Sequence, residues 1–358
     1  MTSTITAFHC ASALGNENSE AYANYLNGFA PGMRETSGDI PGRSIFFGHV
    51  TAALPAIAEK RWDMRTNALL EFSYAHLKEY VEALKRKYGK DRIAVILGAS
   101  NTGIDEAQNY VDDWLDSGEK PDKMDFSMIE LGTPSLYLQS LAGTTGAAYT
   151  ISTACSSATK AFGAAARLLE SGVCDAVITG GVDGRCRFAM NGFNALGALS
   201  EGRCRPLSKD RDGINLGEAV ALFTLEKEGE GPKVLSIGES SDAYHATAPD
   251  PEGNGAEAAM RDALDKAGLT PSDIDYINLH GTGTQANDSM ELKAVQRVFG
   301  STPPFYESTK SLTGHCLGAA GAIEAAICAM RIMAKTSRVA ISNSFAFGGS
   351  NASIIISA

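Results

Sequence analysis

Two segments made almost wholly of small residues constrain the fold of this chain more than any other feature of its sequence. The first is AFGAAARLL at residues 161–169, and the second is GAAGAIEAAICAM at residues 318–330. Both have helical composition, but small side chains cover nearly every side, so neither has the broad polar face of a surface helix. Small residues also let backbones pack closely. We therefore expect both helices to lie buried between two sheets.

The surroundings of the two segments repeat as well. Residues 149–153 (YTIST) lead into the first helix, and residues 305–309 (FYEST) lead into the second. Each helix is followed by an apolar strand and a glycine turn, ITGGVDG at 178–184 and SFAFGGSN at 344–351. This repeat predicts a duplicated architecture of five layers, αβαβα, with two similar halves.

Strand and helix patterns alternate along the chain, which predicts an α/β fold with mostly parallel sheets. Runs of β-branched and apolar residues predict buried strands at 92–97, 148–153, 175–179, 220–225, 276–279, 339–342 and 353–356. Helical patterns occupy residues 66–87, 156–170, 255–267, 289–298 and 318–333. We expect the two halves to divide near residue 228, as 1–228 and 229–358.

Charge and cysteine content limit the partners and the compartment. The formal net charge is −11, so nucleic acid, which needs a basic face, is not an expected partner. The seven cysteines are odd in number and scattered, which indicates a reduced, cytoplasmic protein without a disulfide framework. The first 15 residues lack the basic stretch of a signal peptide, and the longest apolar stretch contains Glu324, so we expect no membrane span.

One cysteine lies where a nucleophile would be activated. Cys155, in TACSSATK, falls between a predicted strand and the first buried helix. The free N–H groups at a helix start favour the thiolate, so we expect a lowered pKa at Cys155. Buried cysteines are more often inert apolar residues, and we assign that role to the other six.

Two histidines lie in Gly/Thr-rich turns, the positions where α/β proteins place ligand sites. His280 is in NLHGTGTQAND, at the end of a predicted strand, and His315 is in STKSLTGHCLGAAGAIE, before the second buried helix. Cys155, His280 and His315 could together bind a metal, but no short ligand pair such as CxxC or HxxxH accompanies them, and we expect no metal. The turn NSFAFGGSN at 343–351 could direct backbone N–H groups into a cavity as an oxyanion hole.

Four of these motifs together resemble one family. TACSSATKA, HGTGTQANDSME, STKSLTGHCLGAAGAIEAA and NSFAFGGSNAS are similar, in order and spacing, to the motifs of the β-ketoacyl-acyl-carrier-protein synthases. The resemblance runs from about residue 90 to the end and more loosely over the first 90 residues. It implies the thiolase-like fold and the decarboxylating condensation of an enzyme-bound acyl chain with a malonyl unit on acyl carrier protein. The Cys/His/His set resembles the elongating branch of the family.

The resemblance also implies roles for individual residues. Cys155 would carry the acyl chain as a thioester, with the N–H groups of Cys155 and Phe347 as its oxyanion hole. His280 and His315 would donate hydrogen bonds to the malonyl thioester while CO₂ leaves. Lys310 and Glu324, with Asp288 and Glu291, would support the histidines. Thr282 and Thr284 would bind the pantetheine arm. Phe345 and Phe347 would contact the substrate, and Phe347 would also act as a gate.

The resemblance implies two protein partners and no cofactor, since the substrates arrive on the phosphopantetheine of acyl carrier protein. Carrier proteins are acidic, so we expect a basic docking patch, with Lys60, Arg61, Arg65, Arg203, Arg205, Lys209 and Arg211 as candidates. The uncharged run AAYTIS would be prone to aggregate if it were an exposed edge of a sheet. We therefore expect a dimer that pairs through residues 147–153. The second subunit could be a copy of this chain or a paralogue resembling a chain-length factor.

Three alternatives remain beside the elongating synthase. A thiolase would have a second reactive cysteine in a C-terminal CxG motif, whereas Cys316 and Cys328 are followed by Leu-Gly and Ala-Met. An initiating synthase, which uses acyl-CoA, would have Asn in place of the second histidine. A non-catalytic chain-length factor would lack the nucleophilic cysteine. The chain is shorter than typical elongating members, which suggests a specialised pathway, such as aryl-polyene or polyketide formation, rather than housekeeping fatty-acid synthesis.

Overall fold

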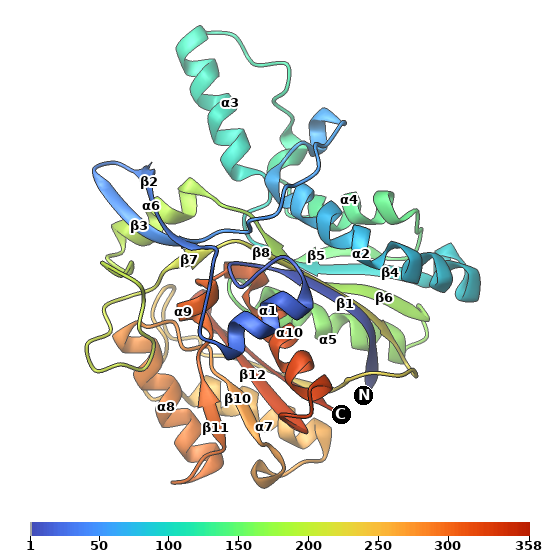
Figure 1. Cartoon of the computed structure of the whole chain (residues 1–358), viewed down its shortest axis with the longest axis vertical. Coiled ribbons are helices and arrows are strands. Elements are labelled where there is room, and N and C mark those ends of the chain that lie inside the picture. The colour runs from blue at the N-terminus through green and yellow to red at the C-terminus, as the bar shows by residue number, and fades with distance from the viewer. Residues whose placement is uncertain (1) are drawn as a thin grey trace.

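A computed structural model describes residues 2–358, and its centre is one continuous sheet of ten strands (Figure 1). The strand order is β11-β10-β12-β13-β9-β1-β8-β6-β4-β5. The strands of the N-terminal part are β1 (Ser3–Ala11), β4 (Ile93–Gly98), β5 (Ala148–Ile151), β6 (Ala176–Asp183) and β8 (Ala219–Glu226). Those of the C-terminal part are β9 (Lys233–Ser241), β10 (Tyr276–Asn278), β11 (Phe305–Glu307), β12 (Val339–Ala346) and β13 (Ser350–Ser357).

The two parts of the sheet have the same internal order. From the outer edge inward, β5-β4-β6-β8-β1 corresponds strand for strand to β11-β10-β12-β13-β9. The parts join where Ser3 and Thr4 of β1 pair with Val234 and Lys233 of β9. β8 ends at Glu226 before the second part begins. This correspondence supports, as a proposal, the division of the chain into residues 1–228 and 229–358.

The expectation of mostly parallel sheets is wrong. Only the outer strands are parallel, in the pairs β4–β5, β4–β6, β10–β11 and β10–β12. The pairs β6–β8, β8–β1, β1–β9, β9–β13 and β12–β13 are antiparallel. The connection between β12 and β13 is too short for the crossover that a parallel pair needs, whereas β8 follows β6 only after residues 184–218.

The two small-residue helices lie at the centre, as expected. α5 (Ser157–Glu170) packs on β4 and β6 and also touches β9 and β13, while α10 (Ala320–Met333) packs on β12 and also touches β8 and β1. A side chain at Gly321 would come within 2.2 Å of the hydroxyl of Thr159, so the closeness of the helices requires glycine there. The two parts of the sheet therefore enclose α5 and α10 between them, which gives the expected five layers.

The outer layers are formed by four helices that each have exposed residues (Figure 1). α2 (Arg65–Tyr88) and α4 (Thr133–Ala142) cover the N-terminal part, and α7 (Asn254–Ala267) and α8 (Gln285–Phe299) cover the C-terminal part. All five predicted helices and all seven predicted strands are present, within four residues of their expected bounds.

Besides α4, β1, β9 and β11, several further elements were not expected from the sequence. They are α1 (Asn18–Leu26), α3 (Ile104–Ser117), α6 (Arg187–Ala195), α9 (Lys310–Thr313), and a small sheet of β2 (Met33–Ile40), β3 (Arg43–Gly48) and β7 (Leu216–Gly217). Single 3₁₀ turns are η1 (Lys60–Trp62), η2 (Lys90–Arg92), η3 (Phe126–Ile129), η4 (Pro271–Asp273), η5 (Leu317–Ala319) and η6 (Phe347–Gly349). Among residues 2–358, none of the helices has the length and apolarity needed to cross a bilayer.

Candidate active site

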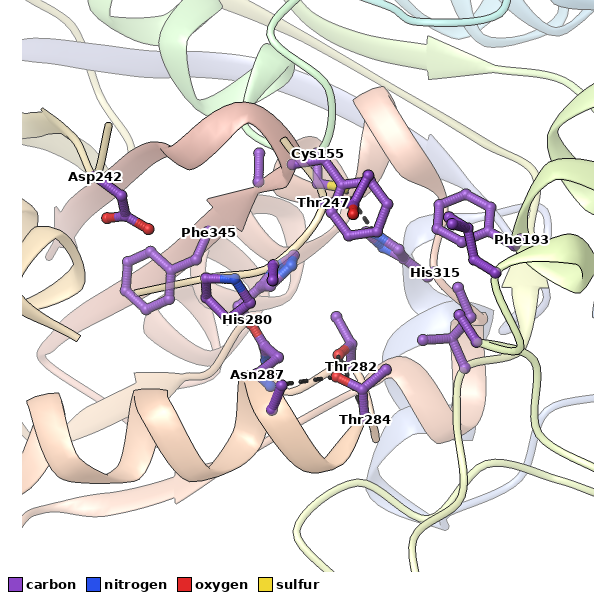
Figure 2. A pocket seen from close by; sticks show the side chains of 18 of the residues that line it. Cys155, Phe193, Asp242, Thr247, His280, Thr282, Thr284, Asn287, His315 and Phe345 are labelled. Carbon is purple, nitrogen blue, oxygen red and sulfur yellow. Dashed lines mark hydrogen bonds between the residues drawn. The ribbon is translucent and has the colours of Figure 1, made fainter. Parts of the chain in front are cut away.

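Residues from both parts of the chain line one cavity of about 220 Å³ (Figure 2). Cys155 comes from the N-terminal part, and His280 and His315 come from the C-terminal part. Their ligand atoms all lie within 4.8 Å of one another. The motifs predicted to act together therefore meet in space.

Cys155 sits on a tight connection between β5 and α5. Ala154 before it has φ +52°, a strained value for a residue with a side chain. The hydroxyl of Ser157 holds this connection, because it donates to the carbonyl of Ala154 and accepts from the N–H of Thr153 at 2.9 Å. The strain keeps the Cys155 side chain directed into the cavity, where it is 6 % exposed.

The expected low pKa of Cys155 is wrong for this structure. Burial raises the pKa of the thiol to about 11, although Lys310 and the N–H groups of Phe347 and Cys155 itself act in the opposite direction. The partial charges at the helix start are too weak to offset the loss of water around a thiolate. Cys155 is therefore a neutral thiol at pH 7.

The backbone N–H groups of Cys155 and Phe347 both act on the sulfur in the direction that favours the thiolate. Two backbone donors beside the reacting atom can also stabilise an oxyanion formed on a thioester at that atom.

His315 is the direct neighbour of the thiol. Its Nε2 lies 2.9 Å from Sγ of Cys155, and its backbone N–H donates to the carbonyl of Asn215 at 2.7 Å. Nδ1 is buried and has no partner among residues 2–358. A bare lone pair there costs less than an unpaired N–H group, so the neutral ring carries its proton on Nε2.

His280 is held by a buried ion pair. Nζ of Lys310 lies 3.5 Å from Nδ1 of His280 and donates to Glu324 in a short hydrogen bond. Lys310 is fully buried, and an ammonium group can only donate, so Nδ1 accepts and the proton of the neutral ring is on Nε2. Both histidines therefore present Nε2–H groups in the cavity.

Burial and positive charge keep both rings neutral. Desolvation lowers the pKa of His280 and of His315 well below the usual range, and the ammonium of Lys310 lowers both further. The rings meet edge to face, with centroids 5.3 Å apart. The two neutral rings can each donate an Nε2–H hydrogen bond to an anionic oxygen beside the buried thiol.

Glu291, on α8, fixes the backbone of the His280 turn. Its carboxylate accepts from the N–H of His280 at 2.8 Å, from Gly281 at 2.7 Å and from the amide of Asn343 at 3.2 Å. Burial raises the pKa of Glu291 to about 7.

Asp288 organises the neighbouring GTG turn. Its carboxylate accepts from the N–H of Gly283 at 3.1 Å and from that of Leu207 at 2.8 Å. The hydroxyls of Thr282 and Thr284 lie 3.1 Å apart at the cavity wall, and Thr284 also caps the start of α8 (Figure 2). This part of the cavity offers hydroxyls to a polar ligand.

The two phenylalanines of the glycine turn differ in burial. Phe345 is 5 % exposed and packs edge-on at 6.2 Å from His280, whereas Phe347 is 37 % exposed and lies 5.5 Å from Phe193. Gly348 and Gly349 have φ values of 79° and 73°, which only glycine adopts without strain. The structure brings both phenylalanines to the cavity, with Phe347 on its open side.

The candidate docking residues are not equally available. Arg65 makes two hydrogen bonds of 2.5 Å to the buried Glu218, and Arg211 is largely buried beside Asp288 at 3.5 Å. These two arginines are structural partners of acidic residues rather than free surface charges. The others are exposed, namely Lys60, Arg61, Arg203, Arg205 and Lys209, although Arg61 pairs with Glu59 and Arg205 with Asp210.

Two groups of residues have metal-ligating atoms close together. In the first, Cys155, His280 and His315, the ammonium of Lys310 opposes a cation. The second consists of His9, Glu17 and His76. The rings of its two histidines are stacked 3.8 Å apart and nearly parallel, so their in-plane lone pairs cannot meet at one ion.

Two fully buried acids were missed by the sequence analysis. Asp183 accepts from the N–H groups of Ser100, Asn101 and Gly318, which joins the ends of β6 and β4 to the start of the second buried helix. Burial raises its pKa to about 6. Glu218 binds Arg65. A carboxylate within an apolar run, as in ITGGVDG and NLGEAVALF, is the signal that could have indicated both.

The sequence matches two family models that together span most of the chain. Residues 33–230 match the β-ketoacyl synthase N-terminal domain, and residues 233–341 match the β-ketoacyl synthase C-terminal domain. A 3-oxoacyl-[acyl-carrier-protein] synthase 2 of Staphylococcus aureus is 31 % identical over 94 % of this chain and 86 % of its own length. One from Rhizobium meliloti is 39 % identical, over 59 % of this chain and 61 % of its own length.

Solved structures agree over nearly the whole chain. A chain from the complex of the ketosynthase ApeO with its chain length factor ApeC, from Xenorhabdus doucetiae, is 40 % identical, with a TM-score of 0.95 over 99 % of this chain and 97 % of that one. A chain of the ishigamide ketosynthase/chain length factor is 27 % identical, with a TM-score of 0.90 over 99 % and 98 %.

The family is one of acyltransferases that lengthen an acyl chain by condensation, with substrates held on the phosphopantetheine of acyl carrier protein and no separate cofactor. Both family models, a relative aligned over most of both lengths, and a cavity that gathers the cysteine and the two histidines agree. The chain belongs to the β-ketoacyl synthase family.

Proposed function

We propose that this chain is a catalytic ketosynthase subunit that condenses an acyl group on Cys155 with a malonyl unit on acyl carrier protein. The observation that carries the proposal is the 2.9 Å contact between Sγ of Cys155 and Nε2 of His315, with the Lys310-held His280 in the same cavity. A chain-length factor has no use for a nucleophile. An initiating synthase has Asn in place of the second histidine.

In the first half-reaction, the sulfur of Cys155 attacks the thioester of an acyl carrier protein. The N–H groups of Cys155 and Phe347 hold the oxyanion of the tetrahedral intermediate. The bond to the pantetheine sulfur breaks, and the proton of the Cys155 thiol ends on the departing thiol. The products are an acyl-enzyme thioester and free carrier.

In the second half-reaction, malonyl carrier loses CO₂, and the electron pair of the broken C–C bond forms an enolate. The Nε2–H groups of His280 and His315 stabilise the enolate oxygen, which is where negative charge develops. The enolate carbon attacks the acyl thioester, the bond to Sγ breaks, and the Cys155 thiolate takes up a proton. The β-ketoacyl chain leaves on the carrier.

The remaining cavity residues receive binding roles. The hydroxyls of Thr282 and Thr284 suit the amide groups of the pantetheine arm. Phe347, exposed on the open side and in contact with Phe193, suits a gate between the acyl and malonyl pockets, while Phe345 packs beneath His280. Lys310, Glu324, Asp288 and Glu291 act through the histidines and the turns, as positioning residues.

We infer that the active form is a dimer with a paralogue resembling a chain-length factor. Within residues 2–358, β5 pairs with β4 alone and so forms a free sheet edge, with Tyr149 39 % exposed. Free edges of this kind invite pairing with another chain. The 40 %-identical structure comes from a ketosynthase in complex with a chain length factor, which favours a paralogue over a second copy.

The carrier is proposed to dock on exposed basic residues. Arg203 and Lys209 lie on the same loop as Arg211, which donates to the carbonyls of Thr284 and Gln285 beside the GTG turn. Lys60 and Arg61 form a second group on η1. An acidic carrier would be attracted locally despite the net charge of −11.

The compartment is proposed from the state of the cysteines, and the pathway from the similarity to ketosynthase–chain length factor complexes. All seven cysteines are buried and unpaired, which suits the reducing cytoplasm. Resemblance to a ketosynthase–chain length factor system favours polyketide or aryl-polyene synthesis over housekeeping fatty-acid synthesis.

The decisive test is intact mass of the protein after incubation with acyl carrier thioesters of several chain lengths. We expect a mass increase equal to the acyl group, absent in Cys155→Ala, and β-ketoacyl carrier after addition of malonyl carrier. No adduct with any acyl carrier would overturn the proposal. An adduct from acyl-CoA alone would instead favour an initiating synthase or a thiolase.

A further inference from the structure

One buried carboxylate outside the mechanism touches the segment that carries His315. Asp183, the last residue of β6, is fully buried, and β6 packs on η5. Its Oδ1 accepts from the N–H groups of Ser100 at 2.9 Å and Asn101 at 2.8 Å. Its Oδ2 accepts from the N–H of Gly318 at 2.6 Å, three residues after His315.

The ring of His315 depends on its backbone for orientation. Nε2 lies 2.9 Å from Sγ of Cys155 (Figure 2), and Nδ1 has no hydrogen-bond partner among residues 2–358. The other histidine differs, because Nζ of Lys310 contacts Nδ1 of His280. The main chain on either side of His315 must therefore fix where its Nε2–H group points.

That main chain is anchored on both sides of the ring. The N–H of His315 donates to the carbonyl of Asn215 at 2.7 Å, and its carbonyl accepts from Gly217 at 3.1 Å. On the other side, Leu317 has φ +49°, which is strained for a bulky side chain. Such strain persists only where surrounding contacts enforce it. The hydrogen bond from Gly318 to the carboxylate directly follows the strained residue and holds it in place.

The duplicated fold repeats this turn at the nucleophile. Gly318 and Cys155 each lie two residues before the start of a buried helix, and each follows a residue with positive φ, Leu317 or Ala154. The N–H of Cys155 remains available to the oxyanion of a thioester. The N–H of Gly318 is taken by the carboxylate of Asp183. Of two equivalent turns, one is open to substrate and the other is occupied by an anion of the protein.

The corresponding strand ends account for this difference. Asp183 ends β6, whereas β12 ends at Ala346, whose small side chain lies at the wall of the cavity that holds Cys155. Burial raises the pKa of Asp183 to about 6, so its carboxylate is ionised at pH 7. A hydrogen bond to an ionised acceptor is about twice as strong as one to a neutral acceptor. The carboxylate is therefore a firm anchor for the second turn.

We propose that Asp183 is a positioning residue for decarboxylation, because its carboxylate fixes the turn at Gly318 and so directs the Nε2–H group of His315 at the enolate oxygen. The same hydrogen bond joins the halves, since β6 belongs to the half that carries Cys155. The inference rests on the proposed ketosynthase function, in which His315 acts on the malonyl unit. Acylation of Cys155 uses other donors and does not need this anchor.

The test measures the two half-reactions separately. Asp183→Asn keeps the shape of the side chain but removes the charge, and its NH₂ group must face an N–H donor, either that of Gly318 or those after β4. The kcat for CO₂ release from malonyl carrier should fall at least about tenfold, because small displacements of a catalytic group are costly. KM for malonyl carrier and the rate of Cys155 acylation should stay within about twofold.

A second variant tests the strained turn. Glycine adopts positive φ without strain, so adding Leu317→Gly to Asp183→Asn should raise kcat for CO₂ release at least about threefold over the single variant. Leu317 packs in an apolar cluster with Ile214 and Leu216. Its removal weakens the core, and so would not repair a variant that was merely unstable.

The matched control is a buried acid on the neighbouring strand. Glu226 ends β8 beside Ala176, at the opposite end of β6 from Asp183, and accepts from Lys87 and Tyr88. Glu226→Gln should lower the free energy of unfolding in urea. Both half-reactions should stay within about twofold of the parent, because the site is distant.

Several results would overturn the inference. They are parental CO₂ release from Asp183→Asn, equal losses in both half-reactions, a change in KM alone, or no recovery in the double variant. Absence of the acyl adduct from both Asp183 variants would also overturn it, because the carboxylate would then serve folding alone. Failure of the ketosynthase function itself would appear separately, as absence of the acyl adduct on Cys155 in the parent chain.

Discussion

Nε2 of His315 lies 2.9 Å from Sγ of Cys155, although the two residues are 160 positions apart and belong to different halves of the sheet. Each stands just before one of the two buried helices, whose crossing at Gly321 sets the separation of their starts. The reacting pair is thus a product of the duplicated fold. A change in how the helices cross would move the thiol away from the imidazole of His315.

The neutral state of Cys155 gives a first prediction. Because burial raises the pKa of the thiol to about 11, the thiolate fraction should rise about tenfold per pH unit through pH 7–10. The rate of Cys155 alkylation by iodoacetamide, measured by intact mass, should follow that slope. A plateau beginning near pH 7 would contradict it, and would restore the low pKa expected from the helix start.

Replacing the nucleophile should separate the two half-reactions. In Cys155→Gln, a neutral amide of similar shape to an acyl thioester occupies the cavity, and both Nε2–H donors remain. Condensation should stop while malonyl decarboxylation continues or increases. The measurement is release of labelled CO₂ from malonyl carrier. If CO₂ release stops as well, Cys155 has a part in decarboxylation that the geometry does not explain.

Each histidine donor should matter to CO₂ release. Loss of one donor to a developing oxyanion typically reduces the rate about 10²–10³-fold. His280→Ala and His315→Ala should each show that loss in CO₂ release, yet still form the acyl adduct on Cys155. The exposed His76→Ala serves as control and should behave as the parent. Parental CO₂ release from His315→Ala would disprove the two-donor mechanism and favour an initiating or thiolase-type enzyme.

The motifs of the site were predictable from sequence because each occupies a short segment at a strand end. Cys155, His280 and His315 lie in turns rich in Gly, Ser and Thr, and small-residue helices determine which turns meet. Local composition was therefore enough to predict both the layered fold and the proximity of the three residues. The duplication was visible for the same reason, since the repeated segments pack against each other.

Other features depend on long-range contacts that no local pattern reports. The pKa of Cys155 depends on how completely the halves bury it, and this reversed the expected direction. Arg65 resembles a free surface cation in sequence, but its partner Glu218 is 153 residues away. The antiparallel pairing of β1 with β8 and β9 likewise joins segments more than 200 residues apart.

The buried ion pair gives a fourth prediction. Lys310→Met leaves Glu324 alone in the interior, with one oxygen already unpartnered, and removing one member of a buried pair typically costs about 3–5 kcal/mol. The double variant Lys310→Met with Glu324→Leu should recover most of that free energy of unfolding, measured in urea. It should not recover activity, since Nδ1 of His280 has lost its donor. Equal destabilisation in both variants would contradict this account.

Glu291 gives the last prediction, a dependence of stability on pH. Burial raises its pKa to about 7 in the folded chain, above the ordinary 4.5, so between those values the folded state holds a proton that the unfolded state has lost. The free energy of unfolding contributed by Glu291 therefore falls as pH rises from about 4.5 to about 7, by at most about 1.4 kcal/mol per pH unit.

Glu291→Gln removes this titration but also breaks one of the two backbone contacts, because its amide NH₂ must face an N–H group of His280 or Gly281. The variant should thus be less stable at every pH, and its deficit relative to the parent should shrink between pH 5 and pH 7. Urea unfolding of both proteins at pH 5, 6, 7 and 8 measures the difference. A deficit that grows with pH would mean that Glu291 is ionised throughout, with its two N–H donors outweighing burial.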